Sequence, residues 1–267
     1  MNDAGAGRTV RWPEAVSARV AAYYTRYYRD ALGIPRWGDL VAARLDEEAG
    51  ESSHLSRVEA ALGRSVAGLR VLNVGCGTGG FSVLAQRAGA SICGIDADLD
   101  AAGISASKAK DAGGLVVAAA AERLPFRDGM FDLVHCFSTL EHVDSAEATV
   151  AEMLRVARRG GAVYVHTPNA LACYETHYKV FWLPLMPRPL ARVYLRLRGR
   201  PTAFLDSLRL LTPRRLESLF ARAGARASRL APPAGLLRES GSPFWPLVRM
   251  YYRVFRVAPS IEVLARR

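Results

Sequence analysis

The sequence of 267 residues lacks any long apolar segment. No stretch approaches the roughly 18 uncharged apolar residues that a membrane-spanning helix requires, so no transmembrane helix is expected. The first nine residues lack the basic start and the apolar run of a signal peptide. These absences favour a cytoplasmic protein. Half of the residues are hydrophobic, which is enough to bury the core of one large domain.

Cysteine is scarce, and its four positions are far apart. They form no CxxC pair, and no histidine lies at a spacing suited to zinc, which argues against a zinc module and a disulfide framework. Three of them fall in segments predicted below as strands or turns, where buried free thiols are common. The four are Cys76, Cys93, Cys136 and Cys173.

Acidic residues are scarce in the C-terminal third. Residues 179–267 hold 18 Lys and Arg against 4 Asp and Glu, a net charge of +14, whereas the first 178 residues carry −3. Of the 36 basic residues in the chain, 33 are Arg. Together with the high alanine content, this indicates a compositional bias that weakens any nucleic-acid interpretation of the net charge. That bias does not explain why the positive charge is confined to one third of the chain.

Strand and helix patterns alternate through the middle of the sequence. This alternation predicts a parallel sheet with helices on both faces. Residues 14–63 are predicted to be helical, with breaks at 33–35 and at Gly50. In the middle, strands are predicted at 69–74, 91–95, 115–119, 131–136 and 162–166, and helices at 81–88, 99–112 and 146–157.

After Pro168 the alternation stops. Two segments rich in aromatic residues and arginine, at about 170–211 and 233–258, are predicted to be cap insertions. Between the two insertions, Thr212 and the following proline suit the start of a helix. A strand at 225–230 is predicted after this helix, and a final strand at 260–266. We therefore expect an N-terminal helical segment at 1–64 that contributes to the cap, and an α/β domain at 65–267.

A glycine-rich sequence follows the first predicted strand. Gly75, Gly77, Gly79 and Gly80 lie between that strand and a helix. Glycines there let the backbone approach a ligand, and the helix N-terminus supplies donors and positive potential. The spacing also matches the dinucleotide pattern GxGxxG, so an NAD(P)-dependent oxidoreductase stays an alternative. Asp96, which ends the next predicted strand, suits hydrogen bonding to ribose hydroxyls in either class of protein.

A third motif, from Ala121-Glu122 through Pro125-Phe126 to Phe131-Asp132, separates the two classes. With the glycine loop and Asp96, it resembles the class I S-adenosylmethionine-dependent methyltransferase superfamily. The resemblance is strongest to the group that includes ubiquinone and menaquinone biosynthesis enzymes, and it covers about residues 68–168. It implies a Rossmann-like α/β fold: a seven-stranded, mostly parallel twisted sheet, helices on both faces, a helical cap insertion, and a last strand antiparallel beside the fifth.

The same resemblance implies S-adenosyl-L-methionine as cofactor. Glycines of the loop would line its methionine portion, the acidic strand end would hold the ribose, and the Ala-Glu step would lie against the adenine. Asn73 replaces an acidic residue common in the superfamily and would weaken a contact to the cofactor ammonium. The expected cofactor-binding residues are Asn73, Gly75, Cys76, Gly77, Gly79, Asp96, Ala97, Ala121, Glu122, Phe137 and Ser138.

Three side chains are candidates for proton removal from the acceptor: His142, His177 and Glu175. Methyl transfer needs alignment of nucleophile, methyl and sulfur, plus a base where the acceptor is a hydroxyl. In the quinone O-methyltransferases, a similar stretch has an additional Glu three positions before a Glu-His pair, and these side chains are implicated in divalent metal binding. Here the pair is Glu141 and His142, and Ser138 takes the place of the additional Glu. One carboxylate and one imidazole suit Mg²⁺ poorly, so no metal is expected.

The expected activity is O-methylation of a small-molecule or lipid-like metabolite. The alternatives are methylation of a membrane- or glycan-linked intermediate, N- or C-methylation, the oxidoreductase, and a catalytically silent binding module. The basic amphipathic patterns of the two insertions permit three interpretations: docking on the anionic inner face of a membrane, a lid over an acidic small molecule, or a cap with solvated arginines. Nucleic acid is disfavoured because no RNA-binding motif is present. The sequence predicts no oligomeric state.

Overall fold

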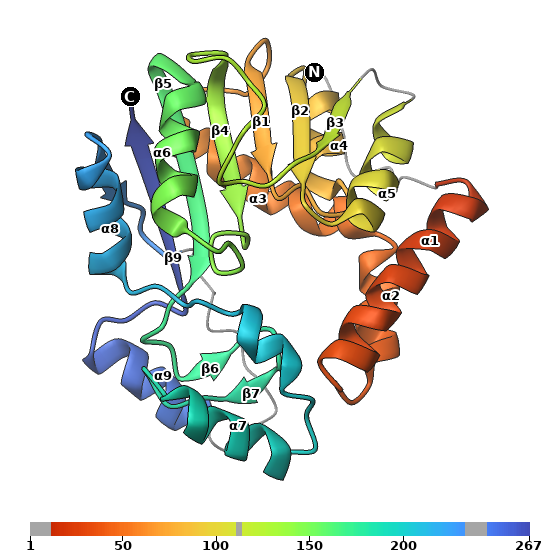
Figure 1. Ribbon diagram of the computed structural model, residues 1–267, viewed down its shortest axis with the longest axis vertical. Helices are drawn as coiled ribbons and strands as arrows, with labels where there is room; N and C mark the ends of the chain where they lie inside the picture. Colours follow the sequence, from red (N-terminus) through yellow and green to blue (C-terminus); the bar gives the residue numbers. More distant parts are fainter. Residues whose placement is uncertain (1–11, 111–113, 233–244) are drawn as a thin grey trace, which may run out of the picture.

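Seven strands form one sheet in the computed structural model, which describes residues 12–110, 114–232 and 245–267. Part of the second expected insertion, 233–244, lies outside the described residues. The strand order is β3-β2-β1-β4-β5-β9-β8 (Figure 1). The strands are β1 (Arg70–Val74), β2 (Ser91–Asp96), β3 (Leu115–Ala118), β4 (Phe131–Phe137), β5 (Ala157–Pro168), β8 (Arg226–Arg229) and β9 (Ser260–Arg266).

The central strands are parallel, and the last one reverses direction. β1 pairs in parallel with β2 and β4, and β5 pairs in parallel with β4. β9 lies antiparallel between β5 and β8. Both faces of the sheet are covered, which explains why its strands are near-continuous apolar runs rather than alternating ones. The predicted fold class is therefore confirmed.

Helices cover the two faces of the sheet (Figure 1). On one face α6 (Ala146–Val156) and α8 (Pro213–Arg222) pack against strand residues that include Leu72 and Val74. On the other face α3 (Glu47–Leu62) and α4 (Gly80–Arg87) pack against Val71 and Tyr164. Alternate residues of β1 thus belong to different cores, as the two-residue period of a strand requires. α5 (Leu99–Ala109) packs against β2 and β3.

The N-terminal segment is helical, as predicted. It consists of α1 (Glu14–Thr25), a π-helical turn η1 (Arg26–Ala31), α2 (Trp37–Arg44) and the beginning of α3. The predicted break at 33–35 is present, but the one at Gly50 is wrong, because Gly50 lies inside α3. A glycine inside a helix costs about 1 kcal/mol. Burial of Val58 and Leu62 in the core of the domain offsets that cost.

The cap between β5 and α8 contains a short hairpin and two helices. The hairpin strands are β6 (Tyr174–Glu175) and β7 (Val180–Phe181), followed by α7 (Arg188–Leu197) and the 3-10 helix η3 (Ala203–Ser207). Val180 and Trp182 pack with α7, α1 and η1 in one apolar cluster, so the N-terminal segment and the cap share a core. The described part of the second insertion, α9 (Trp245–Val254), packs near Phe181 on the hairpin.

None of the described helices combines the length and the apolar character needed to cross a lipid bilayer.

A buried ion cluster fastens the N-terminal helices to the α/β domain. Lys108 of α5 lies 2.6 Å from Glu47 Oε1 and 2.9 Å from Glu48 Oε1, with no more than 5% of any of these three side chains exposed. Glu47 also accepts a hydrogen bond from the hydroxyl of Thr78, in the glycine loop. A buried charge requires such pairing, since removing one partner leaves the others uncompensated.

We expect Lys108→Ala to lower the free energy of unfolding by about 3–5 kcal/mol, because two buried carboxylates lose their cation. Urea denaturation of the purified protein measures it. Lys110→Ala is the matched control, since Lys110 is exposed on the same helix end and should change little. A loss below about 1 kcal/mol for Lys108→Ala would show that the cluster is not needed for stability.

Candidate active site

A cavity of about 760 Å³ lies at the carboxyl ends of the first four strands. This edge is where open α/β sheets bind their ligands. The loops after β1, β2, β3 and β4 form one side, while α1, η1 and the cap form the other. The cavity is lined by Tyr23, Tyr24, Tyr27, Tyr28, Arg44, Gly75, Gly77, Ile95, Asp96, Ala97, Asp98, Ala119, Ala120, Ala121, Glu122, Ser138, Thr139, His142, Val143, Asp144, Thr176, His177, Lys179 and Phe204.

The glycine loop presents bare backbone to this cavity. Gly75 and Gly77 have positive φ angles of 68° and 54°, which side chains rarely adopt. A Cβ on Gly75 would lie 2.1 Å from Thr139 Oγ1, whereas one on Gly77 would meet no atom within 4 Å. Gly75 therefore permits close packing against the loop after β4, and Gly77 leaves open space where a ligand can approach the chain.

Asp96 connects the end of β2 to the glycine loop. Its carboxylate accepts the backbone N–H of Gly77 at 2.8 Å and that of Asp98 at 2.9 Å. Burial raises the pKa of Asp96, while these two backbone donors oppose the rise. Each carboxylate oxygen has a second lone pair, so Asp96 can hold the loop and still accept hydroxyl donors from a ligand.

A cluster of histidines and carboxylates lies beside the cap hairpin. His177 Nδ1 is 2.7 Å from Glu175 Oε1, and His177 Nε2 is 3.7 Å from Glu141 Oε1. The ring of His142 stands edge-on to that of His177, with centroids 5.1 Å apart. Glu141 and His142 come from the loop after β4, whereas Glu175 and His177 come from the cap hairpin, so only the folded chain assembles this group.

The environment of the cluster shifts its protonation. Burial raises the pKa of Glu141 to about 7, although the nearby His177 opposes the rise. Burial lowers the pKa of His142 to about 4, which leaves that imidazole neutral near pH 7. His177 is also buried, but its hydrogen bond to Glu175 and the charges of both carboxylates raise its pKa above the usual value.

Sequence comparison identifies relatives with the same motifs. Residues 72–165 match the methyltransferase domain family. A ubiquinone biosynthesis O-methyltransferase of Rhizobium rhizogenes is 36% identical over 129 residues, which are 45% of this chain but only 52% of the relative. A protein of the same name from Aromatoleum aromaticum is 30% identical over 189 residues, covering 70% of this chain and 72% of the relative.

The chain belongs to the class I S-adenosylmethionine-dependent methyltransferases. Solved structures share its fold. A methyltransferase from Mesorhizobium loti superposes with a TM-score of 0.56 at 17% identity, over 81% of this chain and 97% of that one. Magnesium protoporphyrin IX methyltransferase from Synechocystis gives 0.53 at 16% identity, over 94% and 99%. S-adenosyl-L-methionine is the methyl donor of this family.

Most of the cofactor residues expected from the sequence line the cavity of this methyltransferase. The glycine loop, Asp96 and the Ala121-Glu122 step come together there. Their backbone and carboxylate groups suit an adenosyl group with an amino acid tail. The lining residues among those expected are Gly75, Gly77, Asp96, Ala97, Ala121, Glu122 and Ser138. Glu122 also has a structural task, because its Oε1 accepts the backbone N–H of Asp144 at 2.7 Å.

Asn73 and Phe137 are not among the lining residues. The Asn73 amide donates to Ser82 Oγ at 3.0 Å, and its oxygen lies 2.8 Å from His135 Nδ1, on the α3–α4 face of the sheet. Phe137 stacks on His166 with centroids 4.0 Å apart. Each side chain is therefore fixed by partners of its own, and a contact of Asn73 or Phe137 with the cofactor stays a prediction.

Cys76 and Gly79 shape the loop without lining the cavity. The Cys76 thiol packs under Gly94 of β2, and Gly79 lies against Ser105 of α5. Glu175, expected near the acceptor, is also absent from the lining: one oxygen bonds His177 and the other accepts the N–H of Tyr178 at 2.5 Å. Glu175 is thus a positioning residue for His177, whereas His142 and His177 do line the cavity.

Several lining residues were not expected from the sequence. Lys179 and Phe204 come from the cap, and Arg44 comes from α2. Tyrosines of α1 and η1 also line the cavity. Among them, Tyr23 donates to Asp98 Oδ2 at 3.2 Å, beside Asp96. The only sequence signal for the cap residues is their position after the fifth strand. The described part of the second insertion does not line this cavity.

Glu141, His142 and His177 form a group with the spacing of metal ligands. One ligand atom from each lies within 4.8 Å of the others. A carboxylate with two imidazoles suits a transition metal better than Mg²⁺, which prefers oxygen ligands. Glu141 and His142 are adjacent in the sequence, but the addition of His177 was not predicted, because His177 lies in a distant segment. The absence of a metal thus stays a prediction.

We expect Asp96→Ala to weaken binding of S-adenosylhomocysteine by about 10- to 100-fold, because hydrogen bonds to a charged acceptor contribute about 1.5–3 kcal/mol. Isothermal titration calorimetry measures the affinity. Asp100→Ala, an exposed aspartate four residues later, is the control and should bind normally. Unchanged affinity in Asp96→Ala would remove Asp96 from the cofactor site.

Proposed function

We propose that this methyltransferase O-methylates a small molecule that carries both a hydroxyl group and an acidic group. The observation that carries the proposal is the His177–Glu175 pair, whose His177 lines the same cavity as the glycine loop and Asp96. A base held in a fixed orientation has a use when the acceptor is a hydroxyl, since that proton must leave as the new bond forms.

In the proposed reaction the acceptor oxygen forms a bond to the methyl carbon while the carbon–sulfur bond breaks. The bound cofactor supplies an electrophilic methyl group on a sulfonium. His177 Nε2 takes the hydroxyl proton. Glu175 accepts a hydrogen bond from Nδ1–H, which fixes the tautomer that leaves Nε2 free to act as a base. The neutral His142 beside it supplies a polar contact without adding a charge.

The proposed acidic group of the acceptor is argued from two cations at the cavity. Lys179 and Arg44 both line it, and their charges lie close enough that Arg44 contributes to a lowered pKa of Lys179, of which burial is the main cause. Arg44 donates to the Tyr28 hydroxyl at 3.0 Å and lies 3.9 Å from Glu47. Lys179 is therefore the cation of the two without a paired carboxylate among the described residues. Two cations in one cavity favour a carboxylate or phosphate on the ligand. Phe204, beside both histidines, favours an apolar or aromatic body.

The relatives support O-methylation but not a particular acceptor. Those reported above are called ubiquinone biosynthesis O-methyltransferases, and the first of them is matched over about half of its length. A lipid-like acceptor related to a quinone precursor is therefore compatible with this proposal.

A metal-assisted O-methylation is the second candidate, and the geometry of Glu141, His142 and His177 favours it. A divalent metal held there would lower the pKa of a coordinated hydroxyl, so that no separate base is needed. The acceptor and the products are the same in both candidates. They differ in whether His177 carries a proton or a metal.

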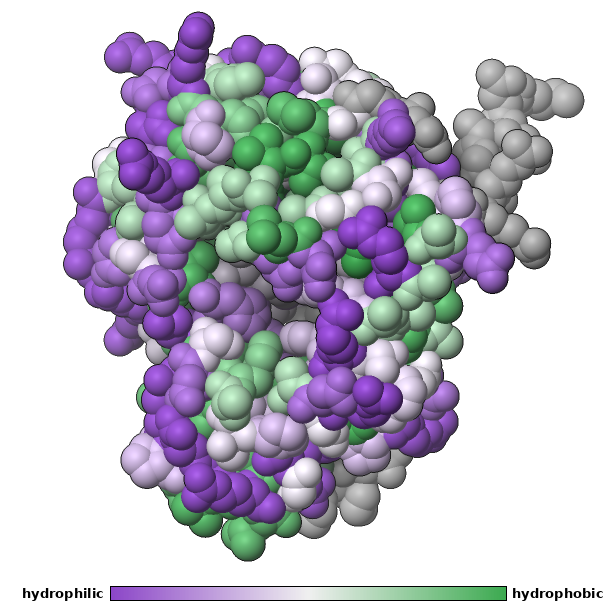
Figure 2. Space-filling view, turned by 45° about the vertical axis from the view of Figure 1, so that its right-hand side comes forward, coloured by the Kyte–Doolittle hydropathy of each residue, from purple (hydrophilic) through white to green (hydrophobic). Residues whose placement is uncertain are grey.

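We also propose that the enzyme is cytoplasmic and makes peripheral contact with an anionic membrane. Most of the large apolar side chains that the described residues expose belong to the cap and α9, and hydrophobic side chains reach the surface at the lower end of the molecule in Figure 2. Basic residues accompany them, as in interfacial helices. The exposed side chains of this region are Leu183, Leu185, Leu190, Val193, Leu197, Leu247, Met250, Val254 and Phe255.

We expect hydroxylated carboxylic acids to accept the methyl group and their methyl esters to be poor acceptors. Release of S-adenosylhomocysteine from a panel of such acid and ester pairs measures this. Lys179→Gln should raise KM for the acid about 10-fold or more and leave the ester unchanged, because only the acid loses a charged contact. Lys110→Gln is the control. A preference for esters or for amines would contradict the proposed acceptor class.

We expect Glu175→Gln to move the acidic limb of the pH–rate profile to lower pH. A carboxylate beside His177 raises its pKa, so a neutral partner lets His177 lose its proton at lower pH. Activity below neutrality should therefore persist further in the variant, while kcat falls. His177→Ala should lower kcat by about 10²–10⁴-fold.

Glu147→Gln, a change in an exposed pair with Arg215, is the control for this shift. A limb that stays in place would contradict the base role of His177. Dialysis against a chelator is the second arm. Activity that is lost there, and regained with a transition metal, would support the metal-assisted candidate instead.

A further inference from the structure

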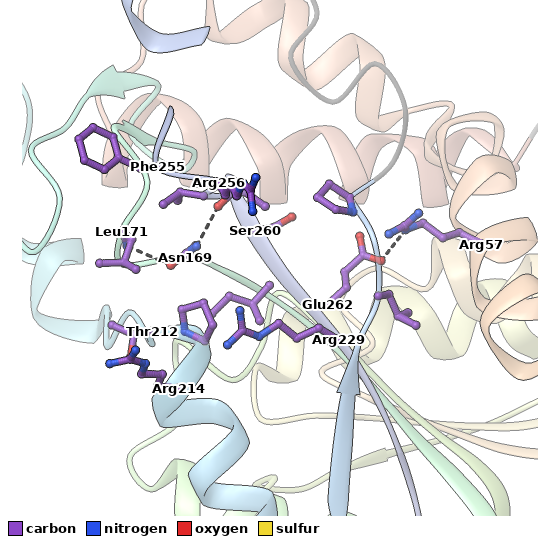
Figure 3. A pocket seen from close by; sticks show the side chains of 16 residues that line it. Arg57, Asn169, Leu171, Thr212, Arg214, Arg229, Phe255, Arg256, Ser260 and Glu262 are labelled. Carbon is purple, nitrogen blue, oxygen red and sulfur yellow. Dashed lines mark hydrogen bonds and ion pairs between the residues drawn. The ribbon is translucent and has the colours of Figure 1, made fainter. Parts of the chain in front are cut away.

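A second cavity, of about 550 Å³, lies away from the cofactor site (Figure 3). It is bounded by the N-terminal end of α8, by β8 and β9, and by the segment that joins α9 to β9. It shares no residue with the cavity described above, and the methyl transfer proposed there does not use it. It is lined by Arg57, Asn169, Leu171, Thr212, Pro213, Arg214, Arg229, Leu230, Pro232, Phe255, Arg256, Val257, Ala258, Ser260, Ile261 and Glu262.

The cavity is strongly basic. Four arginines line it, and Glu262 is the single acidic residue among the lining residues. Arg57 is occupied, because it pairs with Glu262. Arg229 forms an exposed pair with Glu217, 2.5 Å away. For Arg214 and Arg256 the described part of the chain supplies no acidic partner, so two cations at the cavity lack a countercharge.

The arginines come from separate elements and surround one space. Figure 3 shows Arg256 and Ser260 on one side of the cavity and Arg229 on the other, with Arg214 at the edge beside Thr212. Arg214 lies in the first turn of α8, whose N-terminal end carries a partial positive charge. Guanidinium groups with a hydroxyl between them suit a phosphate, whose oxygens accept several charge-assisted hydrogen bonds.

The remaining walls are apolar. Leu171, Leu230, Val257 and Ile261 line the cavity between the charged groups. A free inorganic anion would leave these surfaces in contact with water. A ligand that joins a phosphate to an apolar body would cover both kinds of wall.

An exposed apolar stripe leads to this cavity along α9. Leu247, Met250 and Val254 lie three and four residues apart, and 56–67% of each is exposed. Phe255 follows at 65% exposed and is itself a lining residue. The opposite side of α9 is fixed to the cap through the buried Val248 and Tyr252. The stripe is therefore directed to solvent at the mouth of a basic cavity.

We propose that this second cavity binds the phosphate group of an anionic phospholipid, with the α9 stripe in contact with the acyl chains. Arg214, Arg229 and Arg256 hold the phosphate oxygens, and Ser260 donates from its hydroxyl. This cavity would be the site of the membrane contact proposed above, and its assignment rests on that contact. It does not depend on the identity of the methyl acceptor.

Sedimentation with vesicles tests the proposal on the full chain. The wild type should bind vesicles of phosphatidylcholine with phosphatidylglycerol and should not bind phosphatidylcholine alone. Arg214→Gln combined with Arg256→Gln should weaken that binding by roughly 10- to 30-fold, since each basic residue near an anionic surface contributes to the affinity. Arg64→Gln combined with Arg87→Gln, two exposed arginines that follow α3 and end α4, outside the cap, α9 and the cavity, is the matched control and should bind within about threefold of the wild type.

Calorimetry with soluble probes separates the cavity from the membrane surface. Dihexanoyl phosphatidic acid should bind with one-to-one stoichiometry in the wild type and in Met250→Ser/Val254→Ser, and weakly in the double arginine variant. Met250→Ser/Val254→Ser should lose binding to vesicles but keep binding of the short lipid. Affinity for S-adenosylhomocysteine should be the same in all variants, which shows that each is folded.

Three results would overturn the proposal. They differ in whether the proposed membrane contact is also lost. Vesicle binding that the double arginine variant keeps would exclude this cavity but leave the membrane contact in place. Inorganic phosphate that binds as tightly as the short lipid would indicate a site for a water-soluble phosphate. A wild type that binds no vesicle would remove the membrane contact as well, while the proposed methyl transfer would stand.

Discussion

The buried carboxylate of Glu47 is the contact on which the shape of the cofactor cavity depends. It pairs with Lys108 of α5, accepts the hydroxyl of Thr78 in the glycine loop, and receives a hydrogen bond from Tyr24 of α1. One charge thus joins the N-terminal helices, the loop after β1 and the helix after β2. A buried carboxylate is stable only with such partners, so the three elements are held together or not at all. The tyrosines that cover the cofactor side of the cavity owe their place to this junction.

The features predicted correctly from the sequence are those encoded locally. The apolar runs of the strands, the glycine loop and Asp96 each lie within a few residues, and the parallel order follows from the alternation of strands and helices. Side chains that depend on a partner far along the chain were missed. Lys179 and Arg44 meet at one cavity although 135 positions separate them. Asn73 could have been placed from strand parity alone, because its neighbours Leu72 and Val74 face α6 and α8, so Asn73 must face α3 and α4.

The arginines of the C-terminal third include some that bind other parts of the chain and some that have no acidic partner among the described residues. The amino-acid composition does not distinguish the two groups. Several hold the cap in place. Arg188 donates to the Leu208 carbonyl at 2.6 Å, Arg192 pairs with Asp206, and Arg200 donates to the Gly33 carbonyl, which joins the cap to the N-terminal segment. These hydrogen bonds and ion pairs add to the apolar core that the cap shares with the N-terminal segment. The arginines around the second cavity include two with no such partner in the described chain. The charge excess of this third is therefore partly structural, and the remainder is available to an anionic ligand.

The cluster of Glu141, His142, Glu175 and His177 makes the cap a part of the proposed active site and not a covering added to it. Glu141 and His142 follow β4 of the central sheet, but His177, which joins the cluster to the cap, lies on the turn between β6 and β7. Glu175 is fixed by the hairpin backbone at Tyr178, and it in turn fixes His177. A change in the hairpin would therefore displace a side chain at the reacting end of the cavity without touching the cofactor loop. If His177 acts as the proposed base, one sheet binds a common methyl donor while a short hairpin determines the chemistry applied to the acceptor.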